Sequence, residues 1–146
     1  YLHNAMKVQF ILFMLVFASI SACGKNDPHP VPSVPFDFSI DISLPSYNSL
    51  MGVSGWTYVN GGSRGIVVYR RGVDEFIAFV RHSPADVNGT CPQPLVTDPD
   101  NFLQLNDTCN NATFSLYDGA PITNSTFGLR MYSTIWDGNH GLRIYN

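Results

Sequence analysis

Apolar and polar side chains alternate with a period of two over residues 36–43. Phenylalanine or isoleucine stands at each even position in this run, and aspartate or serine at each odd position. Because successive side chains of a strand point to opposite faces of its sheet, the pattern predicts a strand with one solvated face. No stretch after residue 35 shows the 3.6-residue period of an amphipathic helix. The predicted class of this part of the chain is therefore all-β.

Short β-prone segments separated by turn residues continue along the rest of the sequence. An Asn-Gly-Gly-Ser-Arg run at residues 60–64 predicts a hairpin loop, because asparagine and glycine tolerate positive φ. A polar, proline-containing stretch over residues 82–101 predicts a long loop. The predicted strands are 36–43, 56–59, 65–69, 75–80, 102–105, 113–117, 129–135 and 142–145.

The segment before residue 36 has a different character. Residues 6–22 place a lysine before an apolar run and end in small residues, an order typical of a secretory signal peptide. The apolar run is shorter than the ~20 residues that a membrane-spanning helix needs. The small residues that lead into Cys23 resemble a bacterial lipobox, in which the cysteine is acylated and becomes the new N-terminus. Residues 1–5 precede the predicted start of this signal.

A proline-rich segment follows the predicted lipidation site. Residues 24–35 carry prolines at positions 28, 30, 32 and 35, which favour an extended backbone. At about 3.1 Å per residue, this tether would hold the folded body up to roughly 35 Å from the lipid. Residues 36–146 are predicted to form one domain with a single core. These features predict a lipoprotein of the bacterial cell envelope, held at the membrane through Cys23 and facing the periplasm or the cell surface.

The distribution of charge argues against a nucleic-acid partner. The portion from Cys23 onward keeps seven of the eight basic residues and all eleven acidic ones, a formal charge of −4. The basic residues are scattered, and Arg70 and Arg71 are the only adjacent pair. Nucleic-acid-binding domains instead gather Lys and Arg on one surface.

Five phrases of the sequence, taken in order, resemble the Rieske-like domains of bacterial lipoproteins. They are LPSY at 44–47, GWTYVNGG at 55–62, RGIVVYR at 64–70, DEFIAF at 74–79 and FSLYDG at 114–119. The resemblance covers about residues 36–146. It implies a small fold of stacked antiparallel sheets, in which two long loops at one tip hold a [2Fe–2S] cluster.

A Rieske cluster is held by two cysteines on one iron and two histidines on the other. In the family, one loop supplies Cys-x-His and the other supplies Cys-x-x-His. Alignment on the strands that flank the loops places Ser83 and Ala85 at the ligand positions of the first loop. It places Asp107 and Asn110 at those of the second loop.

Alignment on the cysteines gives a different set of ligand positions. It places Asp86 and Asn88 in the first loop, and Cys109 and Ala112 in the second. Neither alignment gives a Cys/His pair at the required spacing, and oxygen ligands are poor substitutes for thiolate and imidazole on a cluster. We therefore predict no cofactor and no metal, and keep a [2Fe–2S] cluster as the alternative.

The resemblance also implies that Cys91 and Cys109 form the disulfide that braces the two loops in respiratory Rieske proteins. The link would close a loop of about 18 residues, to which chain entropy attributes roughly 3 kcal/mol. A structural zinc site is the alternative use of the pair, but zinc needs four nitrogen or sulfur ligands. His82, which precedes Ser83, is interpreted as a partly exposed loop histidine.

Together these features predict a non-catalytic binding or structural module and not an enzyme. The expected partner is a protein or glycan that contacts the tip loops, residues 83–89 and 106–112. The alternative function is electron transfer through a [2Fe–2S] cluster.

Overall fold

The structure is a computed structural model that describes residues 2–7 and 27–146. The apolar run of the predicted signal peptide and the predicted lipidation site Cys23 fall in residues 8–26 and lie outside the described residues. Residues 2–7 are helical. Within residues 27–146 the structure contains ten strands and one 3₁₀ helix. They are β1 (Asp37–Asp41), η1 (Asn48–Met51), β2 (Trp56–Val59), β3 (Ile66–Gly72), β4 (Glu75–Val80), β5 (Val96–Thr97), β6 (Gln104–Asp107), β7 (Ala112–Ser115), β8 (Pro121–Thr123), β9 (Met131–Trp136) and β10 (Gly141–Tyr145).

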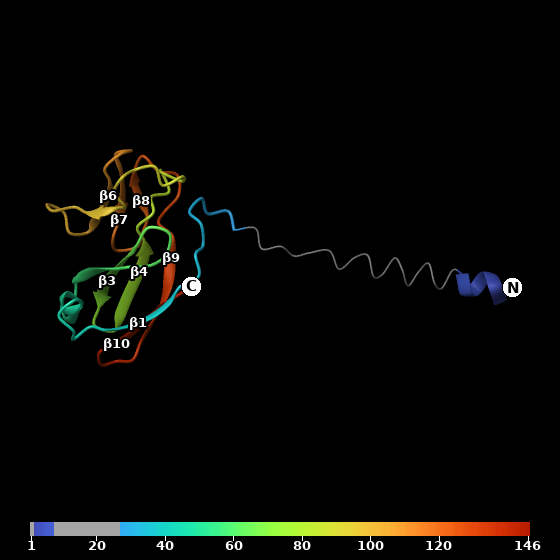
Figure 1. Cartoon of the computed structure of the whole chain (residues 1–146), viewed down its shortest axis with the longest axis horizontal. Helices are drawn as coiled ribbons and strands as arrows, with labels where there is room; N and C mark the ends of the chain where they lie inside the picture. The colour runs from blue at the N-terminus through green and yellow to red at the C-terminus, as the bar shows by residue number, and fades with distance from the viewer. Residues whose placement is uncertain (1, 8–26) are drawn as a thin grey trace.

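The ten strands form two antiparallel sheets (Figure 1). The larger sheet has the order β1-β10-β9-β4-β3-β2, and the smaller one has the order β5-β6-β7-β8. β1 pairs with β10, with Asp37 opposite Tyr145 and Asp41 opposite Gly141. The first and last strands of the domain therefore lie side by side. This architecture confirms the predicted all-β class.

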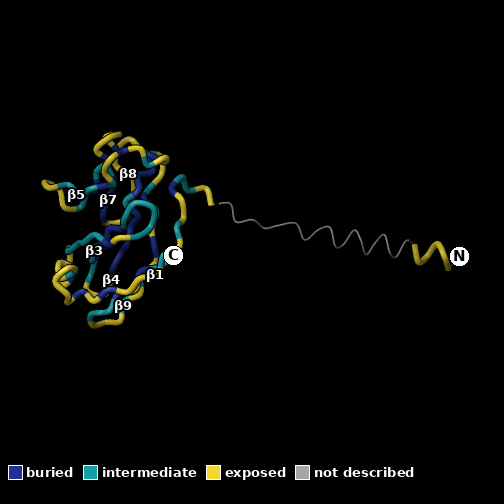
Figure 2. The backbone as a smooth tube through the Cα atoms, viewed as in Figure 1, coloured by how far each residue is buried: buried dark blue, intermediate teal, exposed yellow. Residues whose placement is uncertain are grey.

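The β3–β4 hairpin lies between two hydrophobic cores. In β4, Phe76, Ala78 and Val80 belong to one core, and Ile77 and Phe79 belong to the other. β3 divides its side chains between the same two cores. A strand that is buried on both faces has a continuous apolar sequence instead of an alternating one. Figure 2 shows β4 as a buried, dark blue segment inside the domain.

The smaller sheet is an insertion between two neighbouring strands of the larger sheet. β4 and β9 pair directly, although residues 81–130 separate them in the sequence. The insertion buries Phe114 against the face of β4 that carries Phe79. In the β7–β8 turn Gly119 has a φ of +77°, and a Cβ there would lie 2.6 Å from Phe79 Cε1. Glycine is required at this turn because any larger residue would hold the two sheets apart.

Residues 27–35 pack against the domain instead of forming an extended tether, and Figure 1 shows this light blue segment alongside the sheets before β1. Val31 is fully buried in the core that contains β1 and β10. Arg130 Nε donates a hydrogen bond to the Val31 carbonyl at 2.7 Å, and the Tyr132 hydroxyl donates to the Val34 carbonyl at 2.8 Å. The part of the predicted tether over residues 27–35 therefore does not act as a free spacer, because it is packed on the domain. Proline removes N–H donors from the backbone but leaves its carbonyls free to accept hydrogen bonds from distant side chains.

Some element boundaries differ from the predicted ones. β6 begins two residues later than predicted, at Gln104, and β7 begins one residue earlier, at Ala112. β8 is not predicted because three exposed residues that include a proline give no alternating pattern. The long polar loop predicted over residues 82–101 contains the two-residue strand β5. Within the two described ranges, no helix has the length and apolar character to cross a bilayer.

Candidate functional site

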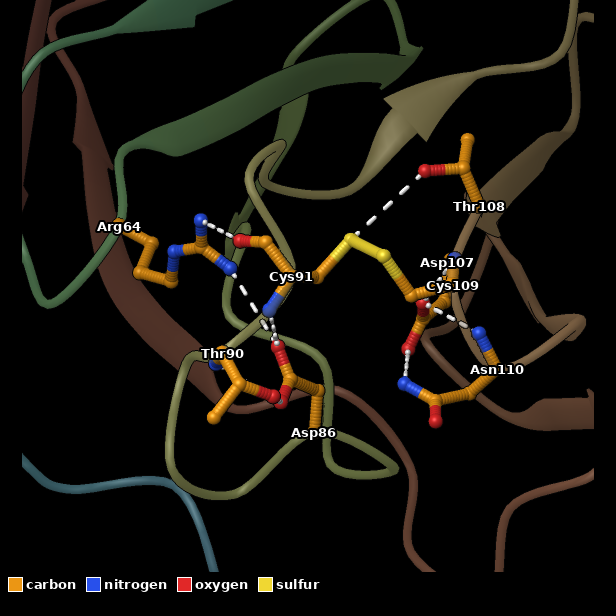
Figure 3. Close-up of a disulfide and its surroundings, with 8 residues drawn as sticks. All are labelled: Arg64, Asp86, Thr90, Cys91, Asp107, Thr108, Cys109 and Asn110. Carbon is orange, nitrogen blue, oxygen red and sulfur yellow. Dashed lines mark hydrogen bonds and ion pairs between the residues drawn. A yellow bond between two sulfur atoms is a disulfide. The ribbon is translucent and has the colours of Figure 1, made fainter.

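The disulfide joins two segments at the tip of the inserted sheet. One is the loop over residues 81–95 that follows β4, and the other is the β6–β7 turn over residues 108–111. Cys91 and Cys109 link them with their Cα atoms 5.8 Å apart, which confirms the predicted pair (Figure 3). Cys91 is buried, whereas Cys109 is exposed at the surface of the tip. The bond therefore fixes the long loop to the turn.

The second segment is a tight turn and not the long loop predicted over residues 106–112. Asp107 ends β6, and its Oδ1 accepts hydrogen bonds from the backbone N–H groups of Cys109 and Asn110, both at 3.0 Å. Asn110 Nδ2 donates to the other carboxylate oxygen at 3.0 Å. Asn111 has a φ of +53°, which asparagine tolerates better than most residues. An aspartate that accepts hydrogen bonds from the following backbone closes a turn within a few residues.

The structure brings together the four ligand positions of the first alignment. Ser83 and Asp107, at the cysteine positions, are both buried, and Ser83 is near enough to Asp107 to help lower the pKa of its carboxyl. Ser83 Oγ also accepts a hydrogen bond from the Ala85 N–H at 3.1 Å. Ala85 and Asn110, at the histidine positions, border the same surface groove. Two buried positions and two surface positions thus form one connected set.

The four positions of the second alignment do not form such a set. Asp86 is buried and bonded within its own loop, and Asn88 is exposed to solvent. Cys109 is bonded to Cys91, and Ala112 is fully buried in the core beneath the sheet. The positions of the second alignment are therefore divided among the long loop, the disulfide and the buried core.

Asp86 organises the long loop around the disulfide (Figure 3). Its Oδ1 accepts hydrogen bonds from the Thr90 N–H at 3.0 Å and from the Thr90 hydroxyl at 2.8 Å, and its Oδ2 accepts one from the Cys91 N–H at 2.9 Å. Arg64, in the β2–β3 loop, lies 3.5 Å from the Asp86 carboxylate and donates to the Cys91 carbonyl at 2.6 Å. No local sequence pattern predicts this role of Arg64, because its partners are distant in the sequence. Together these contacts hold Cys91 in place for its disulfide.

His82 stabilises the same loop and is buried, not partly exposed as predicted. Its Nε2 lies 3.0 Å from the carbonyl oxygens of both Asp86 and Val87. Because carbonyl oxygens only accept hydrogen bonds, Nε2 carries a proton and donates it to them. Nδ1 lies 3.0 Å from the Ser63 hydroxyl. Both ring nitrogens are thus engaged in holding the loop.

The two buried carboxylates of the tip are held in their charged form. Burial alone would raise the pKa of Asp86, but hydrogen bonds from its own loop and the charge of Arg64 outweigh burial and lower that pKa. Burial likewise would raise the pKa of Asp107, and the hydrogen bonds from Ser83 and the β6–β7 turn lower it. Both side chains therefore remain hydrogen-bond acceptors at neutral pH.

The tip is expected to lose stability in acid because of these carboxylates. Each pKa is lower in the folded state than in the unfolded chain, where aspartate titrates at about 3.9. Their contribution to stability is present above that pH and is lost as the pH falls through the folded-state pKa. We expect Asp107→Asn to lower the free energy of unfolding by about 1–3 kcal/mol at neutral pH. The substitution turns one of the two carboxylate oxygens into an NH₂ group, which cannot accept the hydrogen bonds made to that oxygen.

Urea unfolding at neutral and acid pH measures this effect. The difference between wild type and Asp107→Asn should shrink as the pH falls from about 5 to about 2. Asp74→Asn, in the exposed β3–β4 turn, is the matched control and should leave stability within about 0.5 kcal/mol of wild type. An equal difference between wild type and Asp107→Asn at both pH values would contradict the role given to Asp107.

A groove of about 750 Å³ opens beside the four converging positions. Phe127 and Val87 contribute apolar surface to it and are 42% and 46% exposed. Sequence analysis missed the segment 124–127, because a groove wall made of loop residues has no periodic pattern. The lining residues are Pro30, Pro84, Ala85, Val87, Asn110, Asn124, Ser125, Thr126 and Phe127. Among these described residues none is charged.

Three potential metal ligands also meet at the tip. The ligand atoms of Cys91, Asp107 and Cys109 lie within 4.8 Å of one another. Both sulfur atoms are bonded to each other, so neither is a thiolate. Asp107 uses both carboxylate oxygens as hydrogen-bond acceptors within the turn. With the disulfide formed, this cluster is a structural brace and lacks the donors of a zinc site.

Residues 27–146 thus define an all-β domain with a disulfide-braced tip and a neutral groove beside it. Comparison of the chain with models of protein families gives no match, and the curated proteins contain no sequence that matches it. Its function is therefore inferred from the residues of the tip.

Proposed function

We propose that this chain is a lipid-anchored protein of the bacterial cell envelope, with a Rieske-like domain that lacks cluster ligands and acts as a non-catalytic binding or structural module. The anchor is the lipid on Cys23. The sequence phrases carry the family resemblance. The antiparallel sheets and the disulfide-braced tip inserted between β4 and β9 support it.

The chemistry of the four converging positions is the observation that carries this proposal. Ser83, Ala85, Asp107 and Asn110 stand where the resemblance expects sulfur and imidazole. The Ala85 N–H donates a hydrogen bond to Ser83 Oγ and Asn110 Nδ2 donates one to Asp107 Oδ2, so these polar groups have partners without a metal. The disulfide still connects the two segments. The tip therefore keeps its shape while offering a surface in place of a redox centre.

Electron transfer through a [2Fe–2S] cluster is the alternative function. Such a cluster needs two thiolates and two imidazoles. The converging positions provide a hydroxyl, a methyl group, a carboxylate and an amide, and this donor set does not fit the cluster. The neighbouring thiols are consumed by the disulfide, and His82 is engaged in its loop. The residues of the tip thus favour the binding module.

The groove gives the binding proposal its chemistry. Asn110, Asn124, Ser125 and Thr126 bring neutral amide and hydroxyl groups to its wall, and Phe127 brings an aromatic surface. A few polar groups beside an aromatic ring are typical of sites that orient a ligand by hydrogen bonds and bury its apolar side. A partner with neutral polar groups, such as a glycan or a protein segment, fits this lining.

The iron content of natively purified protein tests the proposal. We expect full-length protein extracted from membranes to be colourless and to lack stoichiometric iron and sulfide, because the tip offers no thiolate or free imidazole. Visible spectroscopy and metal analysis measure this. A brown protein with a [2Fe–2S] content, and an electron paramagnetic resonance signal of mixed His/Cys ligation after dithionite reduction, would reject the proposal in favour of electron transfer.

A further inference from the structure

We propose that the tip groove faces the lipid bilayer that holds Cys23, with Phe127 and Val87 in its headgroup layer. This inference rests on the proposed lipid anchor, and it assigns phospholipid headgroups to the groove in place of a glycan or protein partner. It follows from where the packed segment 27–35 begins, how little chain lies between that point and Cys23, and which side chains surround it.

The start of the packed segment is fixed beside one wall of the groove. Asp27 forms an ion pair with Arg130 at 2.6 Å. His29 Nε2 lies 2.9 Å from the Gly128 carbonyl oxygen, and the His29 ring is 6.0 Å from the ring of Phe127. Asp27 is thus held next to the segment that carries Phe127.

The chain between Cys23 and Asp27 limits how far this point can lie from the lipid. Four residues span at most about 14 Å when fully extended. The headgroup layer on each side of the hydrocarbon core is itself about 5–8 Å thick. Asp27 and its neighbours are therefore confined to the membrane surface once Cys23 is acylated. A tether that was free up to Pro35 would have imposed no such limit.

The side chains exposed near Asp27 are of the kinds that can enter a phospholipid headgroup layer. Phe127 and Val87 are 42% and 46% exposed on the rim of the groove. Apolar and aromatic side chains of peripheral proteins lie about 5–10 Å deep at the boundary of headgroups and acyl chains. The described lining residues of the groove are uncharged, so contact with the bilayer does not desolvate an ionised lining side chain. Their amides and hydroxyls face a layer that is rich in ester and phosphate oxygens.

Fluorescence quenching by brominated lipids tests this orientation in the full-length, lipidated protein. Phe127→Trp places a reporter on the groove rim, and Val73→Trp is its matched control. Val73 is 68% exposed in the β3–β4 turn, at the opposite end of β4 from the tip. Trp56 and Trp136 are present in both variants and give the same background. The reporter at 127 should be quenched at least about twofold more than the one at 73, because only the former reaches the acyl boundary.

Flotation with the vesicles separates this inference from the anchor on which it rests. Wild type and both tryptophan variants should float with the vesicles, and Cys23→Ala should not. If the variants float but the two reporters are quenched equally, the tip faces away from the bilayer. The orientation is then rejected while the anchor stands, and the groove is left for a protein or glycan partner. If wild type and Cys23→Ala fractionate alike, both the anchor and the orientation fail.

Discussion

Replacing both Cys91 and Cys109 with alanine is expected to lower the free energy of unfolding by roughly 3 kcal/mol. The disulfide spans a sequence separation of 18 residues, and closing a loop of that size restricts the unfolded chain by about this amount. The substitutions also remove two stabilising features of the folded state. The long loop loses its disulfide to the β6–β7 turn, and the buried Cys91 side chain is truncated.

Urea unfolding of the oxidised wild type and the double variant measures the effect. With a slope of about 2 kcal/mol per molar urea, the midpoint should fall by about 1.5 M. Wild type treated with a reductant is the matched control, and it should unfold close to the double variant. Mass spectrometry without reduction should find Cys91 and Cys109 linked. If both cysteines are freely alkylated, or if reduction leaves the midpoint unchanged, the brace makes no contribution.

The combined substitutions Ser83→Cys, Ala85→His, Asp107→Cys and Asn110→His are expected to give the tip a [2Fe–2S] cluster. They create Cys-x-His in the first segment and Cys-x-x-His in the second, at the positions that the proposed resemblance selects. Buried positions receive the thiolates, and positions on the groove receive the imidazoles. Iron and sulfide analysis of protein from an iron-replete host, with electron paramagnetic resonance after reduction, reports the change from no cluster to one per chain.

The second alignment supplies the matched control for this experiment. Asp86→Cys, Asn88→His and Ala112→His give the same four ligand types at the other positions, provided that Cys91→Ala is added to free the retained Cys109 as a thiol. This variant should take up no cluster and should be less stable, because Ala112 is fully buried and Asp86 holds its own loop together. Iron in the control but not in the first variant would show that the first alignment is wrong. Iron in neither would count against a Rieske-like tip.

The centre of the fold follows from local sequence patterns. The predicted strands 65–69 and 75–80 correspond to β3 and β4, and the loop between residues 60 and 64 corresponds to the predicted hairpin. These segments combine β-branched or aromatic runs with glycine or asparagine turns, so propensity and turn chemistry agree. β8 has neither signal, because its exposed proline, isoleucine and threonine depend on pairing with β7.

The packing of residues 27–35 depends on contacts that no local pattern encodes. Val31 is a single valine among prolines, and its burial relies on Arg130 and Tyr132, about one hundred positions later. The spacing of the prolines indicates an extended backbone, and it does not indicate whether that backbone is free or docked.

The candidate site was predictable as a set of positions but not as a set of contacts. The resemblance proposed from the sequence selects Ser83 and Asp107 as positions in two segments, and both residues are buried. The proximity of these two side chains, the support from Arg64 and the rim formed by Phe127 depend on how three loops meet in space. The burial of His82 likewise depends on three-dimensional contacts. The carbonyl oxygens of Asp86 and Val87 accept hydrogen bonds from its ring, and the turn of its own loop places them there.

The pairing of β1 with β10 delays completion of the domain until nearly all of its chain is available. Asp37 lies opposite Tyr145, so the larger sheet closes only when segments about one hundred residues apart have met. Folds dominated by such non-local pairing form slowly. Under the export that we propose for this chain, slow folding would keep the polypeptide in a translocatable state until the last strand of the domain is available.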